Sequence, residues 1–208
     1  MNEEDRLRVM ATAACDGRSA AHDMSHVERV VSLARTIATA EDARVDVVVP
    51  AALLHELVNL PKGHPDSARS GELCAVAAES VLRDAGVEGE RRVAIFTCIR
   101  EHSFSRGLSP STKEAAVLQD ADRLDAIGAV GVARCFATSA EMGRPFFAPE
   151  DPFCERRAPN DKAYALDHFF GKLLRVEDGL HTQTARALAA PRTAFLRAFL
   201  AALADEMA

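Results

Sequence analysis

The chain has 208 residues, of which 48% are hydrophobic and 27% charged, and its formal net charge is −6. This length and composition are typical of one globular domain with its own hydrophobic core. The negative charge argues against binding to nucleic-acid polymers or anionic membranes, because both attract clustered Lys and Arg. A small phosphorylated substrate needs only a few local basic groups and is not excluded.

The cysteines and the N-terminal residues indicate in which cellular compartment the protein is expected. The five cysteines are far apart and form no CxxC pair, so neither a disulfide framework nor a thiolate zinc site is indicated. The N-terminus is acidic and lacks the basic and apolar regions of a signal peptide. No apolar run comes near the ~20 residues of a membrane span. We therefore expect a cytoplasmic protein that does not enter the membrane.

Helical spacing dominates the first half of the chain. Apolar residues recur at threes and fours over residues 24–38, and residues 45–60 are almost continuously apolar. Pro50 is expected to open the second helix at its first turn or to kink it. Asp66 is a suitable N-cap, and Gly86 a suitable stop, for a third helix. A shorter helix is expected around residues 93–99.

The second half begins with a clear start signal. Ser111 and Glu114 have the spacing of a capping box and predict a helix through Ile127. Residues 143–161 are rich in Pro and Phe and predict a long loop or lid, followed by C-terminal helices over 162–208 with a break at Pro191. No strand pattern or repeat is present. The expected architecture is all-α, a single-domain helical bundle over residues 1–208.

His55 and Glu56 stand in the most apolar stretch of the sequence. A buried glutamate is costly unless it is paired or binds a metal. A helix with one polar edge in solvent, or a buried histidine bonded to the glutamate, would explain this pair equally well. Taken alone, the pair favours those alternatives.

His26 and Asp122 can likewise be interpreted either as metal ligands or as ordinary structural residues. His26 lies on the apolar face of its helix, where a structural core histidine is the competing interpretation. Asp122 and Asp125 are one helical turn apart, which is also compatible with an exposed acidic stripe.

Together, His26, His55, Glu56 and Asp122 form a mixed nitrogen and oxygen ligand set. Such a set suits one divalent ion, with Mn²⁺, Fe²⁺, Co²⁺, Ni²⁺ and Mg²⁺ all open. An ion of this kind lowers the pKa of water and polarises a phosphoryl oxygen. The four residues therefore predict hydrolysis of a phosphate ester.

Four blocks of sequence carry a family resemblance: His22-Asp23-Met24-Ser25-His26, Leu54-His55-Glu56-Leu57, Glu101-His102-Ser103 and Gln119-Asp120-Ala121-Asp122-Arg123-Leu124-Asp125. In this order they resemble the HD-domain phosphohydrolase superfamily, especially its small stand-alone bacterial members. The resemblance implies an HD-type helical fold with His26, His55, Glu56 and Asp122 as metal ligands. His22, which also lies in the first block, is assigned to the surface or the pocket rim.

One position departs from the family. The second motif is normally His-Asp, and here it is His55-Glu56. The longer side chain could still coordinate the ion, could displace a water, or could point away and weaken the site. We expect metal binding to be retained, since the acid function and the other three ligands are present.

The resemblance also implies roles around the metal. His102 and Asp125 are the candidate catalytic residues, with Asp125 helping to place the attacking water. Asn59, Lys62, His64 and Arg106 are the candidate substrate-binding residues, because Lys and Arg are the usual partners of phosphate. Solvated loop charge is the competing interpretation.

The sequence thus predicts a metal-dependent phosphohydrolase. Its expected substrate is a small phosphorylated molecule, foremost a (deoxy)nucleotide, attacked by a metal-activated water with release of phosphate or pyrophosphate. The alternative is a nucleotide- or metal-binding protein in which Glu56 has weakened or abolished hydrolysis. A homodimer is left open.

Overall fold

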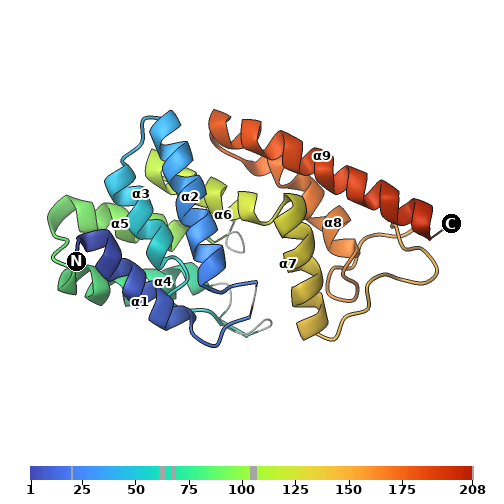
Figure 1. The fold of residues 1–208 in the computed structure, drawn as a ribbon, viewed down its shortest axis with the longest axis horizontal. Helices are drawn as coiled ribbons and strands as arrows, with labels where there is room; N and C mark the ends of the chain where they lie inside the picture. Colours follow the sequence, from blue (N-terminus) through green and yellow to red (C-terminus); the bar gives the residue numbers. More distant parts are fainter. Residues whose placement is uncertain (20, 61–63, 67–68, 104–106, 208) are drawn as a thin grey trace. The chain divides into compact units, whose positions relative to one another are not determined.

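The computed structural model describes residues 1–19, 21–60, 64–66, 69–103 and 107–207. Over these ranges the chain forms helices and turns without any strand, which confirms the all-α prediction (Figure 1). Its internal contacts define two compact units, an N-terminal unit of residues 1–122 and a C-terminal unit of residues 123–208. The organisation as a single domain stays a prediction.

The helices are divided between the two units. The N-terminal unit contains α1 (Glu3–Cys15), α2 (Met24–Ala40), α3 (Val45–Leu54), α4 (Ser70–Asp84), α5 (Gly89–Glu101) and most of α6 (Lys113–Asp125). The C-terminal unit contains α7 (Gly128–Glu141), α8 (Asp167–Gly171), the 3-10 turns η3 (Leu173–Arg175) and η4 (Glu177–Gly179), and α9 (Gln183–Glu206).

The start of α2 is set by Asp23. Its carboxylate accepts hydrogen bonds from the backbone N–H groups of Ser25 (2.9 Å) and His26 (3.2 Å), as an N-cap residue should. The cap fixes His26 in the first turn of the helix. The apolar face that follows is buried along its length and packs against α3.

Helix α3 is buried from Val47 to Leu54 and packs against α1, α2 and α5. Pro50 lies inside the helix and not at its first turn. A proline has no N–H to donate to the carbonyl four residues earlier, which here belongs to Asp46. Arg91 of α5 donates to that oxygen instead, from Nε (3.0 Å) and Nη2 (2.9 Å).

Two helix boundaries differ from the sequence predictions. Helix α3 ends at Leu54, so the expected continuation to residue 60 is wrong and His55 is the C-cap. The N-cap of α4 is Arg69 and not Asp66. Gly86 follows the end of α4 with a φ of +80°, as the predicted stop requires.

The start of α6 also differs in detail. Thr112 is the residue whose side chain accepts a hydrogen bond from the N–H of Ala115 (3.1 Å), so the helix begins after Thr112. Ser111 is instead bound to α5, since its N–H and hydroxyl both donate to the Glu101 carboxylate (2.8 and 3.0 Å). The helix ends at Asp125, short of the predicted Ile127.

The C-terminal unit is built on the packing of α7 against α9. A Cβ atom at Gly131 would lie 2.2 Å from the backbone oxygen of Ala126, so only glycine fits this close approach. Helix α9 runs through Pro191 without interruption, and the predicted break there is wrong. Rings of Phe136, Phe169 and Phe199 meet in the core of this unit.

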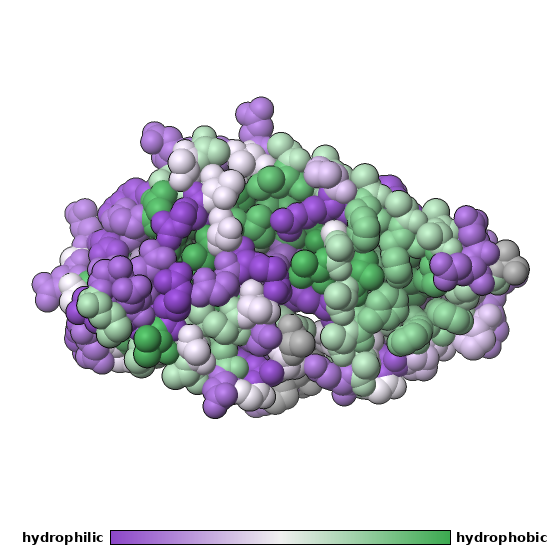
Figure 2. All heavy atoms as spheres, viewed as in Figure 1, coloured by the Kyte–Doolittle hydropathy of each residue, from purple (hydrophilic) through white to green (hydrophobic). Residues whose placement is uncertain are grey.

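By length and composition, α9 is the one helix in the described ranges that could cross a membrane. The expectation that no stretch comes near that length is wrong for this helix. Its buried residues are Ala185, Ala189, Thr193, Leu196 and Leu200, spaced as one face of a helix packed on a protein core. Figure 2 shows apolar residues gathered over the part of this unit where Figure 1 draws α7 and α9, and Phe195 is 45% exposed.

The long non-helical segment predicted for residues 143–161 is present and extends to the start of α8. Its anchor is Asp167, which is fully buried and accepts hydrogen bonds from Arg157 Nη2 (2.7 Å) and the Asn160 N–H (2.6 Å). A second carboxylate, Asp151, accepts the N–H groups of residues 155–157. The segment is therefore held by its own polar contacts.

We expect Asp167→Asn to lower the free energy of unfolding by about 3 kcal/mol at pH 7, because it leaves Arg157 without its charge partner. Burial alone would raise the pKa of the Asp167 carboxyl, but the bonds from Arg157 and Asn160 outweigh it and the pKa falls below 3.8. The stabilisation is then complete above about pH 4 and is lost as the pH falls through the lowered pKa.

Urea unfolding of the two proteins at pH 7 and pH 3 measures this effect. Asp178→Asn, which changes an exposed acid of the same unit, is the control and should alter stability by less than about 0.5 kcal/mol. Equal effects of the two substitutions at pH 7 would contradict the assigned role of Asp167.

Candidate metal centre

Two buried imidazoles face each other in the N-terminal unit. His26 comes from the first turn of α2 and His55 from the C-cap of α3, and each is at most 1% exposed. Their Nε2 atoms are 3.3 Å apart. The start of α2 and the end of α3 thus meet at these two rings.

The protonation of His55 is fixed by the helix that carries it. Its Nδ1 lies 2.6 Å from the carbonyl oxygen of Ala52, and a carbonyl only accepts, so the proton is on Nδ1. The Nε2 lone pair then faces His26. Burial lowers the pKa of His55 despite the nearby Asp122 and Glu56 carboxylates, which keeps the imidazole in the neutral form that binds metals.

Asp122 of α6 completes a first group of donors. Its Oδ1 is 3.5 Å from His26 Nε2 and 3.9 Å from His55 Nε2. Metal–ligand bonds of about 2.0–2.2 Å place neighbouring ligand atoms about 3–3.6 Å apart. The three side chains therefore fit a divalent ion with small adjustments, and they form a group whose ligand atoms all lie within 4.8 Å of one another.

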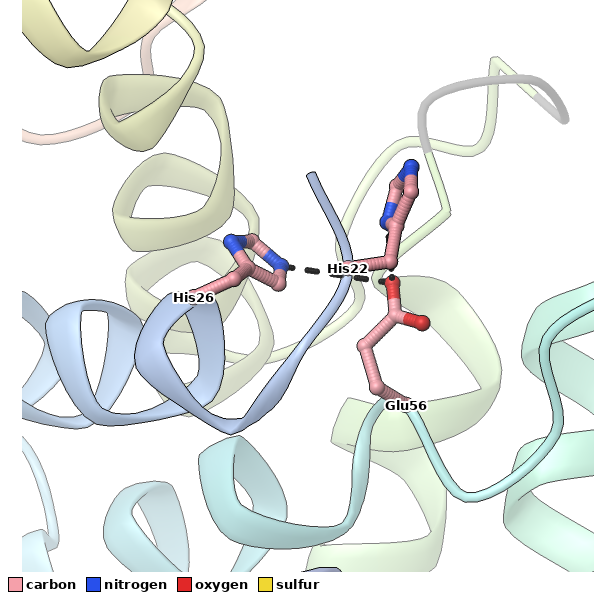
Figure 3. Close-up of side chains that lie close together, drawn as sticks. All are labelled: His22, His26 and Glu56. Carbon is pink, nitrogen blue, oxygen red and sulfur yellow. Dashed lines mark ion pairs between the residues drawn. The ribbon is translucent and has the colours of Figure 1, made fainter. Parts of the chain in front are cut away.

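Glu56 belongs to a different group. Its Oε1 is 3.4 Å from His22 Nδ1 and 4.0 Å from His26 Nε2, so His22, His26 and Glu56 form a second set of donors (Figure 3). Burial alone would raise the pKa of Glu56, but the contact with His22 and the neighbouring imidazoles lower it strongly, so the carboxylate is ionised. His22, assigned to the surface or rim from the sequence, is only 23% exposed at its side chain.

Arg18 is a site residue that the sequence analysis missed. Its guanidinium donates from Nη1 to the backbone oxygen of Glu56 and from Nη2 to that of Leu57 (3.1 Å), and Nη1 lies 3.5 Å from Glu56 Oε2. These contacts hold the turn after α3 in a non-helical course. In the sequence Arg18 is one loop charge among many, and no spacing singles it out.

His102 repeats the construction of His55 at the end of α5. It is the C-cap, its Nδ1 lies 2.6 Å from the Ile99 carbonyl oxygen, and its ring meets that of His55 edge-on at 5.3 Å between centroids. Gln119, fully buried in α6, donates from Nε2 to the backbone oxygens of Glu101 (2.7 Å) and Leu108 (3.0 Å). The helix that carries Asp122 thus also supports the residues after α5.

The other candidate residues lie outside both donor groups. Asn59 is exposed, and His64 Nδ1 accepts the N–H of Asp66 (3.1 Å). Lys62 and Arg106 lie outside the described residues. In the C-terminal unit, the Asp125 carboxylate accepts a hydrogen bond from Arg134 Nη1 (2.7 Å).

Comparison with known proteins identifies the family of this chain. The family model described as HD domain matches residues 24–127. The whole chain is 35% identical to YpgQ, an uncharacterized protein of Bacillus subtilis, and covers 95% of it. The chain therefore belongs to the HD-domain family and is a protein of the phosphohydrolase type, as the four sequence blocks predicted.

Solved structures share the fold over nearly the whole chain. The crystal structure of YpgQ in complex with ADP has a TM-score of 0.76 at 32% identity, covering 98% of this chain and 97% of that one. A Lactobacillus plantarum protein gives 0.79 at 29% identity, covering 99% and 96%. An HD-superfamily hydrolase from Bacillus thuringiensis gives 0.75 at 26% identity, covering 98% and 96%.

We expect His55→Ala and Asp122→Ala each to weaken Mn²⁺ binding at least about tenfold, because each removes one donor of the first group. Isothermal titration of the nucleotide-free protein measures this affinity. Asp84→Asn, which changes an exposed carboxylate at the end of α4, should leave it unchanged. Wild-type affinity in both alanine variants would show that the ion binds elsewhere.

Proposed function

We propose that this protein hydrolyses a phosphate ester or anhydride bond of a small phosphorylated molecule, most suitably a nucleotide, with a divalent ion at the candidate metal centre. The observation that carries the proposal is the convergence of His26, His55 and Asp122. Two imidazole nitrogens and a carboxylate suit Mn²⁺, Fe²⁺, Co²⁺, Ni²⁺ or Mg²⁺.

When bound, the ion would supply a nucleophilic water near neutral pH and would polarise the phosphoryl oxygen. The protein's own part is to hold the donors in place. His55 contributes its Nε2 in a fixed tautomer, since Nδ1 is engaged by Ala52. The apolar burial of α3 and the first turn of α2 keeps both rings rigid.

The remaining roles are part of the proposal. His102 has its Nδ1 proton held by Ile99, so Nε2 is the nitrogen that would accept a proton during the reaction. Asp125 would help to place the attacking water. Asn59, Lys62, His64 and Arg106 would bind the substrate phosphates.

The nucleotide is favoured by the relative YpgQ, whose crystal structure is a complex with ADP. The net charge of −6 makes a nucleic-acid polymer or an anionic membrane an unsuitable partner. A cytoplasmic location is consistent with this substrate class. Assembly into a homodimer remains open to a direct measurement of mass in solution.

A second candidate is a nucleotide- or metal-binding protein without hydrolysis. The contacts of Glu56 favour it, because the carboxylate interacts with His22 and Arg18 and is not in the group formed by His55 and Asp122. Replacing Glu56 by the family's Asp separates the two candidates. A large gain in turnover would support the non-hydrolytic protein, and a loss would show that glutamate serves the reaction.

The test of hydrolysis is release of phosphate or pyrophosphate from a panel of nucleoside mono-, di- and triphosphates with Mn²⁺, Co²⁺, Ni²⁺ or Mg²⁺. We expect Asp122→Asn to lower turnover at least about a hundredfold, because a bound ion supplies several kcal/mol of transition-state stabilisation. Asp84→Asn should keep wild-type turnover. Absence of turnover with every nucleotide and metal would contradict the catalytic proposal.

A further inference from the structure

Two groups of donors overlap at one residue in the N-terminal unit. The first contains His26, His55 and Asp122, and the second contains His22, His26 and Glu56. In both, the distances to the carboxylates run from the same atom, His26 Nε2. The family resemblance accounts for four of these five residues and leaves His22 without a role.

The side chains of His22 and Glu56 face each other. His22 Nδ1 is buried and pairs with Glu56 Oε1 at 3.4 Å, without a well-formed hydrogen bond (Figure 3). A cation between the Nδ1 lone pair and the carboxylate would satisfy both groups.

The orientation of Glu56 is set from its other side. Arg18 lies 3.5 Å from Oε2 and also binds the backbone oxygen of Glu56, so Oε1 is the oxygen that faces His22 and His26. Aspartate is one methylene shorter than glutamate and would hold its oxygens nearer the backbone. The glutamate that distinguishes this chain from its family is thus the residue that reaches His22.

We propose that His22 is a metal ligand, and that Nδ1 of His22 and Oε1 of Glu56 bind the same ion as the first group of donors, which they share through Nε2 of His26. This inference rests on the proposed metal-dependent function and adds a ligand to it. An imidazole nitrogen has one lone pair, so His26 Nε2 binds one ion at a time. The chain therefore binds one ion in total through these five residues, and loss of any one donor weakens that single site.

The coupling between His22 and Glu56 provides the test. Mn²⁺ or Co²⁺ alone is titrated into the nucleotide-free protein, and the dissociation constant is measured for wild type, His22→Gln, Glu56→Asp and the double variant. We expect His22→Gln to weaken binding at least about tenfold in the wild-type background. In the Glu56→Asp background it should weaken binding less than about threefold, because aspartate would not share an ion with His22.

Controls keep the outcomes distinct. His168→Gln, a histidine of neither donor group, should bind like wild type, and the visible absorption of bound Co²⁺ should change in His22→Gln but not in His168→Gln. Circular dichroism and thermal melting confirm folding, and His22→Asn is a second variant with the same expected loss.

Each result decides the proposal. Wild-type affinity in His22→Gln, or equal losses in both backgrounds, overturns the role of His22 and leaves the proposed function intact if His55→Ala and Asp122→Ala still impair binding. Two ions per chain at these residues also overturns it. Absence of metal binding to the wild type overturns both this inference and the proposed function.

Discussion

The hydrogen bond from Nδ1 of His55 to the carbonyl oxygen of Ala52 is the contact on which the donor geometry depends. A buried imidazole without it would have two equivalent tautomers, and its lone pair would have no fixed direction. The end of α3 supplies this acceptor because the carbonyls of a last helical turn lack an intrahelical partner. His102 uses the same arrangement at the end of α5, so helix termini orient both rings.

Charge is distributed asymmetrically around these rings. Asp122 approaches His26 and His55, while Glu56 lies between His22 and Arg18. Arg18 partly neutralises the charge of Glu56. The carboxylates of Glu56 and Asp122 are therefore not equivalent in the charge that they present.

Much of this fold follows from spacing in the sequence. The periodicity over residues 24–38 gave α2, and Gly86 marked the end of α4, because local sterics decide both. Ser111 misled because its hydroxyl binds Glu101, a tertiary contact that no local pattern encodes. The same limit applies to the site: motif spacing singled out the four family positions, whereas Arg18 could be recognised only once its contacts with the turn after α3 were known.

The position of Arg18 and His22 along the chain has a consequence for comparison among relatives. Both precede residue 24, where the match to the HD domain begins, yet both touch the Glu56 carboxylate inside it. A fragment cut to the matched boundaries would keep the family positions and lose two groups that interact with this carboxylate. Comparison of this site among relatives should therefore extend upstream of residue 24, because side chains outside the matched segment set the surroundings of a carboxylate inside it.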